Sequence, residues 1–550
     1  MTKIILKNQD KTKSIQSYEL QNGTLKVRFF GSDKPYTYSK GSFKIIKEPE
    51  LTQNGRKIFE YLSQIAQKVS IKSDDGVLLL AKEFAKINPQ NPKTTLFKYL
   101  NADKIAHYPQ SEPLLFPFGS NLSQFQAVKN ALESQVSIIE GPPGTGKTQT
   151  ILNIIANLLA RGKTVAVVSN NNAATQNVLE KLENYDLDGI CTMLGKRENK
   201  ENFIQNQGAK LAKISEIRSL KVPNSSELNH IKNQINATNA ALQEFFTLQN
   251  EIARDKVLLA QFELEFAHFK SETSLSAPPK IRSLNSLKPQ KILYLKNQLA
   301  ECDKIGFWLK FKLAVLYGIG DFAFYKQPLT PIILAFERLY YERQISTLRQ
   351  KIQANTQKFE LLRQKEPLNT LKSLSMRFLK AHLAQRYSKF SAVKFELDDL
   401  YFRAEDFARQ YPVIFSTTHS VASALRGDFV FDYLICDEAS QVDLATGALA
   451  LGLGANVVIV GDTKQLPNVI AQQIKPEIQA LNEHFGVNLR YDYLAHSFLS
   501  SVDAVFADAP KILLKEHYRC HPKIIEFCNK RFYDSQLIIL SEDGGEKDAI

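Results

Sequence analysis

The chain has 550 residues, with 70 Lys or Arg against 57 Asp or Glu, which gives a net charge of +13 at pH 7. Because single hydrophobic cores stop growing near about 250–300 residues, this length predicts several domains. The apolar content of 44% is ordinary for globular domains, and the positive balance suits a polyanionic partner. The 5 cysteines are odd in number and scattered, so no disulfide framework is implied and a reducing compartment fits.

Targeting, membrane and zinc signals are weak along the whole chain. Residues 1–8 lack the apolar core of a signal peptide, and the most membrane-like window, 306–325, contains charged Lys310, Lys312 and Asp321. A short cluster without a second pair of zinc spacing is interpreted as packing residues: Cys520, His521 and Cys528. We therefore expect a cytoplasmic protein without a membrane span and without a metal site other than one for Mg²⁺.

The first part of the chain is predicted to form a small β module and a helical region. Short β-type runs alternate with turns between residues 14 and 40, and Asn22-Gly23 between two such runs is a hairpin signal. This module is either a contact for protein or nucleic acid or a plain accessory domain. Residues 51–100 have helical periodicity, and 108–117 are predicted to be an extended linker.

A helix is predicted to begin after the linker, with Ser123 as its N-cap. Its Gln124 could read an adenine edge, because an amide donates and accepts hydrogen bonds at once. Alone, this segment would indicate only the start of a helix.

A phosphate-binding loop comes next. Gly141, Gly146, Lys147 and Thr148 fill the constrained positions of the pattern, between an apolar strand and a helical run. Backbone N–H groups at the helix start would face phosphates, Lys147 would neutralise their charge, and the Thr148 hydroxyl would bind Mg²⁺. The order of strand, loop and helix therefore predicts a site for a nucleoside triphosphate.

Two further apolar strands, at 164–168 and 412–415, end in polar clusters. Ligands bind at the carboxyl ends of strands in open α/β sheets, although an ordinary turn would have the same composition. We expect contacts to single-stranded nucleic acid from the side chains at these ends: Ser169, Asn170, Thr417 and Thr418.

Residues 201 to about 400 have a different, helical character. Apolar residues recur every three, four or seven positions in two runs, which predicts two long helices. Pro278-Pro279 breaks the pattern between the runs, so an antiparallel helical hairpin is the simplest interpretation. Residues 281–390 hold 20 basic against 7 acidic side chains. This basic half either contacts nucleic acid or presents a solvated face that docks a protein partner.

Two adjacent carboxylates, Asp437 and Glu438, follow another apolar strand. Such a pair can divide two tasks, with Asp437 holding Mg²⁺ and Glu438 orienting the attacking water. Further along, Gln465 is placed to sense a terminal phosphate, Arg519 could act as an arginine finger, and Tyr518 could stack on a base.

Together these segments resemble superfamily 1 helicases, in the branch of the nonsense-mediated-decay helicase and the Okazaki-fragment helicase-nuclease. The resemblance rests on motifs in family order, which are Asn121 to Gln124, Gly141 to Thr148, Ser169-Asn170, Asp437 to Gln441, Gly461-Asp462 with Gln465 to Pro467, and Tyr518-Arg519 with His521-Pro522. It implies an α/β fold of RecA-like parallel sheets, ATP and Mg²⁺ as cofactors, and movement on single-stranded DNA or RNA with 5′ to 3′ polarity.

The resemblance also predicts the residues of the nucleotide site and the domain organisation. The catalytic set is Lys147, Asp437, Glu438, Gln465 and Arg519, and the nucleotide is held by Gln124, Gly141, Pro142, Pro143, Gly144, Thr145, Gly146, Lys147, Thr148, Gln149 and Tyr518. The expected segments are a β module (1–50), a helical linker region (51–115), the first RecA-like domain in two parts (116–200 and 401–509) around a helical insertion (201–400), and the start of a second RecA-like domain (510–550).

The residues after 510 are too few for a complete second RecA-like core, so we expect either a natural protein that continues past Ile550 or a truncated form. Two hypotheses follow. The first is a nucleic-acid-dependent ATPase and helicase. The second is a nucleotide-gated binding or scaffold protein, in which the helical hairpin recruits partners.

Overall fold

The structure is a computed structural model that describes the chain apart from residues 1, 8, 33, 48, 71, 73–75, 274–286, 303, 318–325 and 542–550. It divides into two compact units. Unit 1 comprises Met1–Ile235 and Lys372–Lys515, and unit 2 comprises Asn236–Leu371 and Glu516–Ile550.

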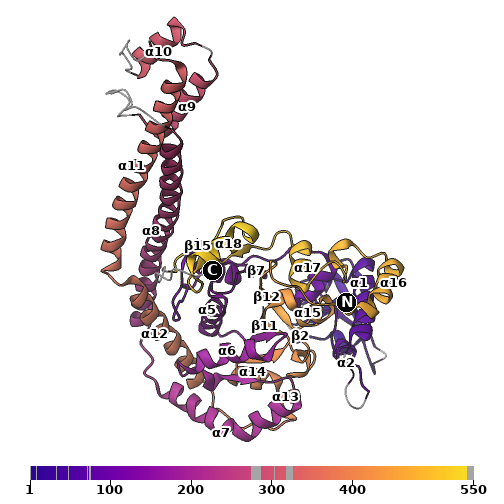
Figure 1. Cartoon of the computed structure of the whole chain (residues 1–550). Coiled ribbons are helices and arrows are strands. Elements are labelled where there is room, and N and C mark those ends of the chain that lie inside the picture. Colours follow the sequence, from indigo (N-terminus) through magenta and orange to yellow (C-terminus); the bar gives the residue numbers. More distant parts are fainter. Residues whose placement is uncertain are drawn as a thin grey trace. The chain divides into compact units, whose positions relative to one another are not determined.

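A seven-stranded sheet with the order β13-β7-β12-β11-β8-β10-β9 forms the centre of unit 1 (Figure 1). Each strand pairs with its neighbours in the parallel sense. Its strands are β7 (Val136–Glu140), β8 (Val165–Ser169), β9 (Cys191–Met193), β10 (Val413–Thr417), β11 (Phe431–Asp437), β12 (Gly454–Gly461) and β13 (Lys511–Leu513). The strands are apolar runs because helices cover both faces of a parallel sheet. The predicted α/β fold is confirmed.

The helices of unit 1 around this sheet come from residues before and after the insertion. They are α4 (Leu122–Glu133), α5 (Lys147–Ala160), α6 (Asn172–Glu183), α7 (Arg197–Ser219), α13 (Asp399–Phe402), α14 (Ala404–Gln410), α15 (Leu444–Leu451), α16 (Lys475–Phe485) and α17 (Phe498–Val505). The predicted helix after the loop is α5, and it is buried on all sides from Thr150 to Leu159.

The edge strand β13 differs from expectation. The sequence places residues 510–550 at the start of a second domain, but β13 pairs with β7, with Ile512 opposite Ile139. The backbone N–H of Leu514 continues this pairing by donating to Glu140 O at 2.7 Å. The first sheet therefore extends to Leu514, because this short strand gains its backbone hydrogen bonds there.

The N-terminal module consists of two three-stranded antiparallel sheets, β2-β1-β6 and β3-β4-β5. Their strands are β1 (Thr2–Leu6), β2 (Gln9–Asp10), β3 (Ile15–Gln21), β4 (Thr24–Phe29), β5 (Tyr36–Tyr38) and β6 (Phe43–Lys47). The predicted hairpin is confirmed: Asn22 and Gly23, with φ of 48° and 75°, join β3 to β4. Positive φ at both central residues is what a tight two-residue hairpin turn requires.

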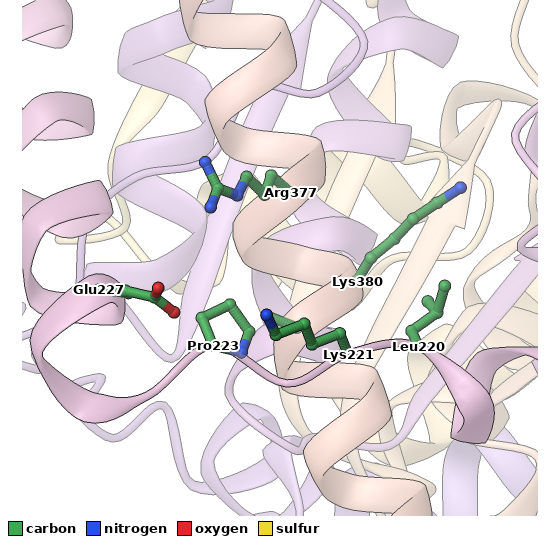
Figure 2. Close-up of a pocket in the computed structure, with 7 residues that line it drawn as sticks. Leu220, Lys221, Pro223, Glu227, Arg377 and Lys380 are labelled. Carbon is green, nitrogen blue, oxygen red and sulfur yellow. The ribbon is translucent and has the colours of Figure 1, made fainter.

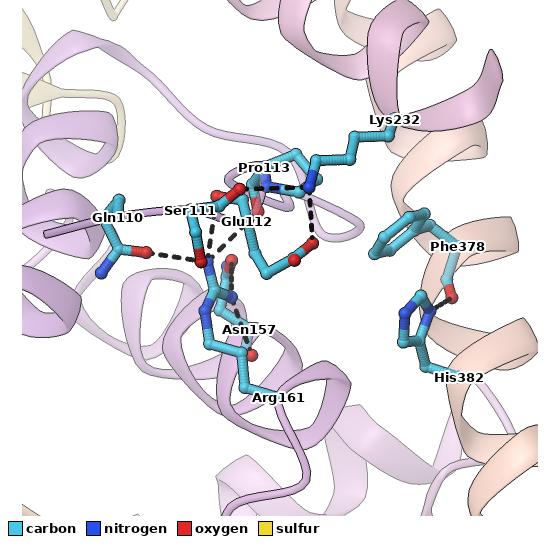
Figure 3. A network of polar contacts seen from close by, with 9 residues as sticks. All are labelled: Gln110, Ser111, Glu112, Pro113, Asn157, Arg161, Lys232, Phe378 and His382. Atoms are coloured by element: carbon cyan, nitrogen blue, oxygen red, sulfur yellow. Dashed lines mark hydrogen bonds and ion pairs between the residues drawn. The ribbon is translucent and has the colours of Figure 1, made fainter. Parts of the chain in front are cut away.

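The predicted helical region and linker follow this module. The helices are α1 (Gln53–Val69), α2 (Leu79–Phe84) and α3 (Thr95–Asn101), and residues 108–117 contain no helix or strand. Arg161, just after α5, holds this linker through hydrogen bonds to Gln110 Oε1 at 3.0 Å and Pro113 O at 3.3 Å (Figure 3). Lys232 bonds to Ser111 O at 3.1 Å. The linker is therefore fixed along its length.

The insertion forms an antiparallel pair of long helices (Figure 1). Its helices are α8 (Ser225–Glu272), α9 (Pro289–Ala300), α10 (Phe307–Tyr317), α11 (Leu329–Arg363) and α12 (Pro367–Ser388). Phe245 of α8 stacks on Phe359 of α11 at 4.6 Å, and Asp255 pairs with Lys351 at 2.9 Å. Later residues of α8 thus contact earlier residues of α11, so the two helices are antiparallel and the predicted hairpin is confirmed. The predicted break at Pro278-Pro279 lies outside the described residues.

Unit 2 also contains the last described elements: β14 (Glu516–His517), α18 (Pro522–Phe532) and β15 (Ile538–Ile539). The strands β14 and β15 pair in parallel, and Asn250 Nδ2 of α8 donates to Glu516 Oε1 at 2.7 Å. Among the helices of the described residues, none is both long enough and apolar enough to cross a bilayer.

Candidate nucleotide site

The phosphate-binding loop joins β7 to α5 and has the backbone that a phosphate cradle needs. Gly144 and Gly146 have φ of 90° and 86°, a region that suits glycine. The Thr145 hydroxyl donates to Pro142 O at 2.8 Å and closes the turn. The free N–H groups of the first turn of α5, from Lys147 onward, therefore end beside the loop, where they favour an anion.

Gln124 lies against this loop from α4. Its Nε2 donates to Thr145 O at 3.1 Å and to Gln149 Oε1 at 3.2 Å, whereas its buried Oε1 has no partner in the described part of the chain. The predicted N-cap Ser123 is wrong, because Asn121 caps α4 by accepting from the Gln124 backbone N–H at 2.9 Å. This cap fixes the first turn of α4 and with it the direction of the Gln124 amide.

Gly146→Ala is expected to abolish tight nucleotide binding while the protein stays folded. A Cβ at this glycine would come within 2.1 Å of Gln124 Nε2, and the residue has a φ that side chains rarely adopt. Titration with a fluorescent ATP analogue would measure the loss. Gly162→Ala, at a glycine of φ +70° with open space around it, is the matched control, since it carries the same backbone strain away from the loop. Equal affinity in both variants would contradict the placement of Gln124.

Neighbouring strands bring the acidic pair to the same loop. Gly461 at the end of β12 accepts a hydrogen bond from the Gly141 backbone N–H at 3.0 Å, and β11 pairs with β12 on its other side. Lys147 Nζ lies 3.0 Å from Gly141 O and 3.5 Å from Glu438 Oε1. The ammonium therefore lies between the loop and the acidic pair.

Asp437 is buried at the carboxyl end of β11, with 6% of its surface exposed. Burial, together with the neighbouring charge of Glu438, raises its pKa to about 6, although Lys147 acts in the opposite direction. Its Oδ1 accepts the Glu438 backbone N–H at 3.0 Å. Glu438 itself has a left-handed backbone with φ of 52°, and its buried Oε2 has no partner among the described residues. A buried acceptor of this kind is suited to hold a water molecule.

Gln465 is fixed next to the end of β12. Its Nε2 donates to Asp462 Oδ2 at 3.0 Å, and the other oxygen of Asp462 accepts the Lys464 backbone N–H at 2.9 Å. Asp462 is 1% exposed, so this buried carboxylate orients the glutamine.

The four side chains predicted to contact nucleic acid lie together at the ends of two adjacent strands. Thr417 of β10 is opposite Ser169 of β8, and the Thr418 backbone N–H donates to Ser169 O at 3.1 Å. Asn170 is exposed and donates through Nδ2 to Gln441 O at 3.4 Å. Ser169 also pairs in register with Asp437, so this cluster adjoins the acidic pair along the same edge of the sheet.

Tyr518 and Arg519 belong to unit 2, whereas the side chains described above belong to unit 1. Tyr518 is 48% exposed. Their predicted roles therefore stay predictions.

A basic pocket that the sequence did not indicate lies elsewhere in unit 1. It has a volume of about 360 Å³ between α12 and the loop that joins α7 to α8 (Figure 2). Its polar lining is mostly cationic and consists of Lys221, Glu227, Arg377 and Lys380. The excess of basic residues in the insertion indicated a positively charged surface, but it did not locate the pocket.

A parallel sheet, a phosphate-binding loop and an acidic pair on a nearby strand define a P-loop NTPase, and its motifs are those of superfamily 1 helicases. The chain belongs to the AAA domain family (AAA_11), which it matches over residues 119–473.

Curated relatives agree with this class. The chain is 26% identical over 532 residues to an uncharacterized ATP-dependent helicase, the MG140 homolog of Mycoplasma pneumoniae, covering 78% of this chain and 47% of that protein. It is 30% identical to the regulator of nonsense transcripts 1 homolog of Drosophila melanogaster over 142 residues, covering 26% of this chain and 12% of that protein. The chain thus spans less than half the length of these relatives. The resemblance to superfamily 1 helicases is confirmed.

Proposed function

We propose that the chain binds and hydrolyses ATP and is the nucleotide-binding part of a helicase that moves on single-stranded DNA or RNA from 5′ to 3′. The observation that carries this proposal is the distance of 3.5 Å between Lys147 Nζ and Glu438 Oε1 at the phosphate-binding loop. A residue that binds a terminal phosphate is thus adjacent to a carboxylate that can orient the attacking water.

The side chains of the site would divide the reaction as follows. Lys147 would exchange its contact with Gly141 O for phosphate oxygens, and Gln124 would bind adenine through its free Oε1. Glu438 would accept a hydrogen bond from water and align it with the phosphorus atom. Gln465, oriented by Asp462, would hydrogen-bond the terminal phosphate until it leaves.

The residues at the loop fit Mg²⁺. The Asp437 carboxylate and the Thr148 hydroxyl would hold it, and the remaining positions would be left to phosphate oxygens and water, as this ion prefers. When bound, Mg²⁺ would neutralise phosphate charge, and it would favour the ionised form of Asp437.

We further propose that residues 116–200 and 401–514 form one RecA-like domain that receives the helical insertion, with a second such domain beginning after Leu514. Single-stranded nucleic acid would contact the edge that carries Ser169 and Thr417. A cytoplasmic location would suit the 5 cysteines, all of which are free thiols in the structure.

Hydrolysis of ATP and its dependence on nucleic acid test this proposal. We expect Mg²⁺-dependent hydrolysis, and affinity for a labelled single strand that falls as salt rises, with a logarithmic slope of about 0.7 per neutralised phosphate. Anisotropy with DNA and RNA of one sequence would measure binding, and duplexes with a 5′ or a 3′ tail would report polarity. A protein that binds ATP and single strands but never hydrolyses ATP would instead be a nucleotide-gated binding protein.

A further inference from the structure

The helix α10 lies at the end of the helical hairpin (Figure 1) and carries exposed aromatic side chains. Four apolar side chains of this helix are between 54% and 80% exposed, and together we call them the tip surface: Phe307, Trp308, Phe311 and Val315. The opposite side of α10 is packed, because Leu313 is buried in a cluster with Leu295 of α9 and Phe336 of α11. The fold of the tip therefore does not depend on the exposed rings.

Lysine side chains flank these rings. Lys310 and Lys312 belong to α10, and Lys304 shortly precedes it. None of the three has an acidic partner in the described part of the chain, whereas nearby Lys296 pairs with Glu337 at 2.9 Å. A surface that combines these lysines with aromatic rings is complementary to a polyanion that also carries planar groups able to stack on the rings.

We propose that the tip surface binds single-stranded nucleic acid, with bases stacked on Trp308, Phe307 and Phe311 and phosphates neutralised by the adjacent lysines. Stacking on aromatic rings suits a strand of any sequence, because every base has a π face. This inference rests on the proposed function and adds a contact far along the hairpin from its root.

The packing of α10 argues against a membrane as the ligand. An interfacial helix presents its polar side to water opposite its apolar side, so that only the apolar side enters the lipid. On α10 the side opposite the rings is occupied by the buried Leu313 and not by a polar side that faces water, and Lys310 and Lys312 flank the rings on the helix surface. The short aromatic face is therefore bounded by cations on both sides, which suits a strand whose stacked bases are flanked by phosphates.

Trp308 gives a direct probe because it is the single tryptophan of the chain. We expect titration of the full chain with single strands of about 20 nucleotides, as poly-dT or poly-U, to quench its emission at the concentrations where a labelled strand binds. Vesicles of phosphatidylcholine with phosphatidylglycerol are expected to leave the emission unchanged. A blue shift with vesicles and no quenching by oligonucleotides would overturn the proposal in favour of a membrane.

Substitutions of Trp308 separate stacking from general apolar contact. Trp308→Ala is expected to weaken oligonucleotide binding about fivefold or more, Trp308→Phe to retain most affinity, and Trp308→Leu to behave like the alanine variant, because leucine is apolar but cannot stack. Phe402→Ala is the matched control, since this ring is 74% exposed on α13 in unit 1. A leucine variant with wild-type affinity would refute stacking.

The outcomes distinguish this inference from the proposed function. If a labelled strand binds but neither Trp308 emission nor the Trp308→Ala variant responds, the tip proposal fails and the helicase proposal stands. If no single strand binds at all, the proposed function fails together with it. Replacing Lys310 and Lys312 with glutamine is further expected to reduce the salt slope by about 1.4, as two phosphate contacts would contribute.

Discussion

Replacing Lys147 with alanine is expected to weaken ATP binding by about 10–150-fold, the range for a hydrogen bond to a charged group. Lys147 is the cation at the loop, and its Nζ already lies within 3.0 Å of Gly141 O. Glu438→Gln should retain ATP binding and lower turnover by about 100-fold or more, because it removes the group that orients water and leaves the cradle intact. The two variants thus separate binding from chemistry.

Equilibrium titration with a fluorescent ATP analogue and steady-state hydrolysis measure the two effects. Lys389→Ala, at an exposed lysine of unit 1, is a matched control for loss of a positive charge. Unchanged affinity in Lys147→Ala would refute the nucleotide site. Wild-type turnover in Glu438→Gln would leave the site intact and remove Glu438 from its proposed role.

Asp437→Asn is expected to abolish hydrolysis and yet to stabilise the nucleotide-free fold at neutral pH. Burial raises the pKa of Asp437 from 3.8 to about 6. The folded state therefore binds more protons than the unfolded state between these values, so the contribution of this residue to stability falls as pH rises through that window. Burying the charged Asp437 carboxylate lowers the free energy of unfolding by ~3 kcal/mol above about pH 6, and this loss is absent below about pH 4.

The difference in thermal denaturation between Asp437→Asn and wild type isolates this carboxylate from others that titrate in the same range. We expect the variant to unfold at a higher temperature at pH 7.5 and at a similar temperature at pH 4. Asp432→Asn, which replaces a carboxylate of the same strand whose pair with Lys163 is partly exposed, is the control. A constant difference at both pH values would show that Asp437 is not held in a strained, charged state.

The nucleotide-binding loop could be predicted because its chemistry is local in sequence. Gly141 to Thr148 fill one short pattern, and the strand before it and the helix after it are contiguous. The hairpin was similarly readable, since Phe245 and Phe359 belong to regular apolar repeats that meet in the structure. Periodicity predicted which faces are apolar, and packing of two such faces followed.

Features that depend on distant partners could not be predicted. The edge position of β13 depends on its pairing with β7, where Ile138 N donates to Pro510 O and Leu514 N donates to Glu140 O, and a three-residue strand alone fits either domain. The N-cap of α4 was predicted at Ser123 and lies at Asn121, because both residue types can cap a helix and only the backbone geometry decides between them. The exposure of Trp308 was hidden for a related reason. The apolar residues of α10 lie on more than one face of the helix, and the sequence does not show that the face with Leu313 packs against α11.

The helix α5 links the nucleotide loop to the root of the hairpin within unit 1. It begins at Lys147, and its 14 residues carry the chain about 21 Å to Arg161, which holds the same linker that Lys232 of α8 contacts. Partial burial lowers the pKa of Arg161, whose guanidinium replaces lost hydration with several carbonyl acceptors. A shift of α5 along its axis must therefore carry the linker and the first turns of α8 with it, or break these bonds. Rigid-body movement of α5 would thus couple the nucleotide-binding loop to the first turns of α8.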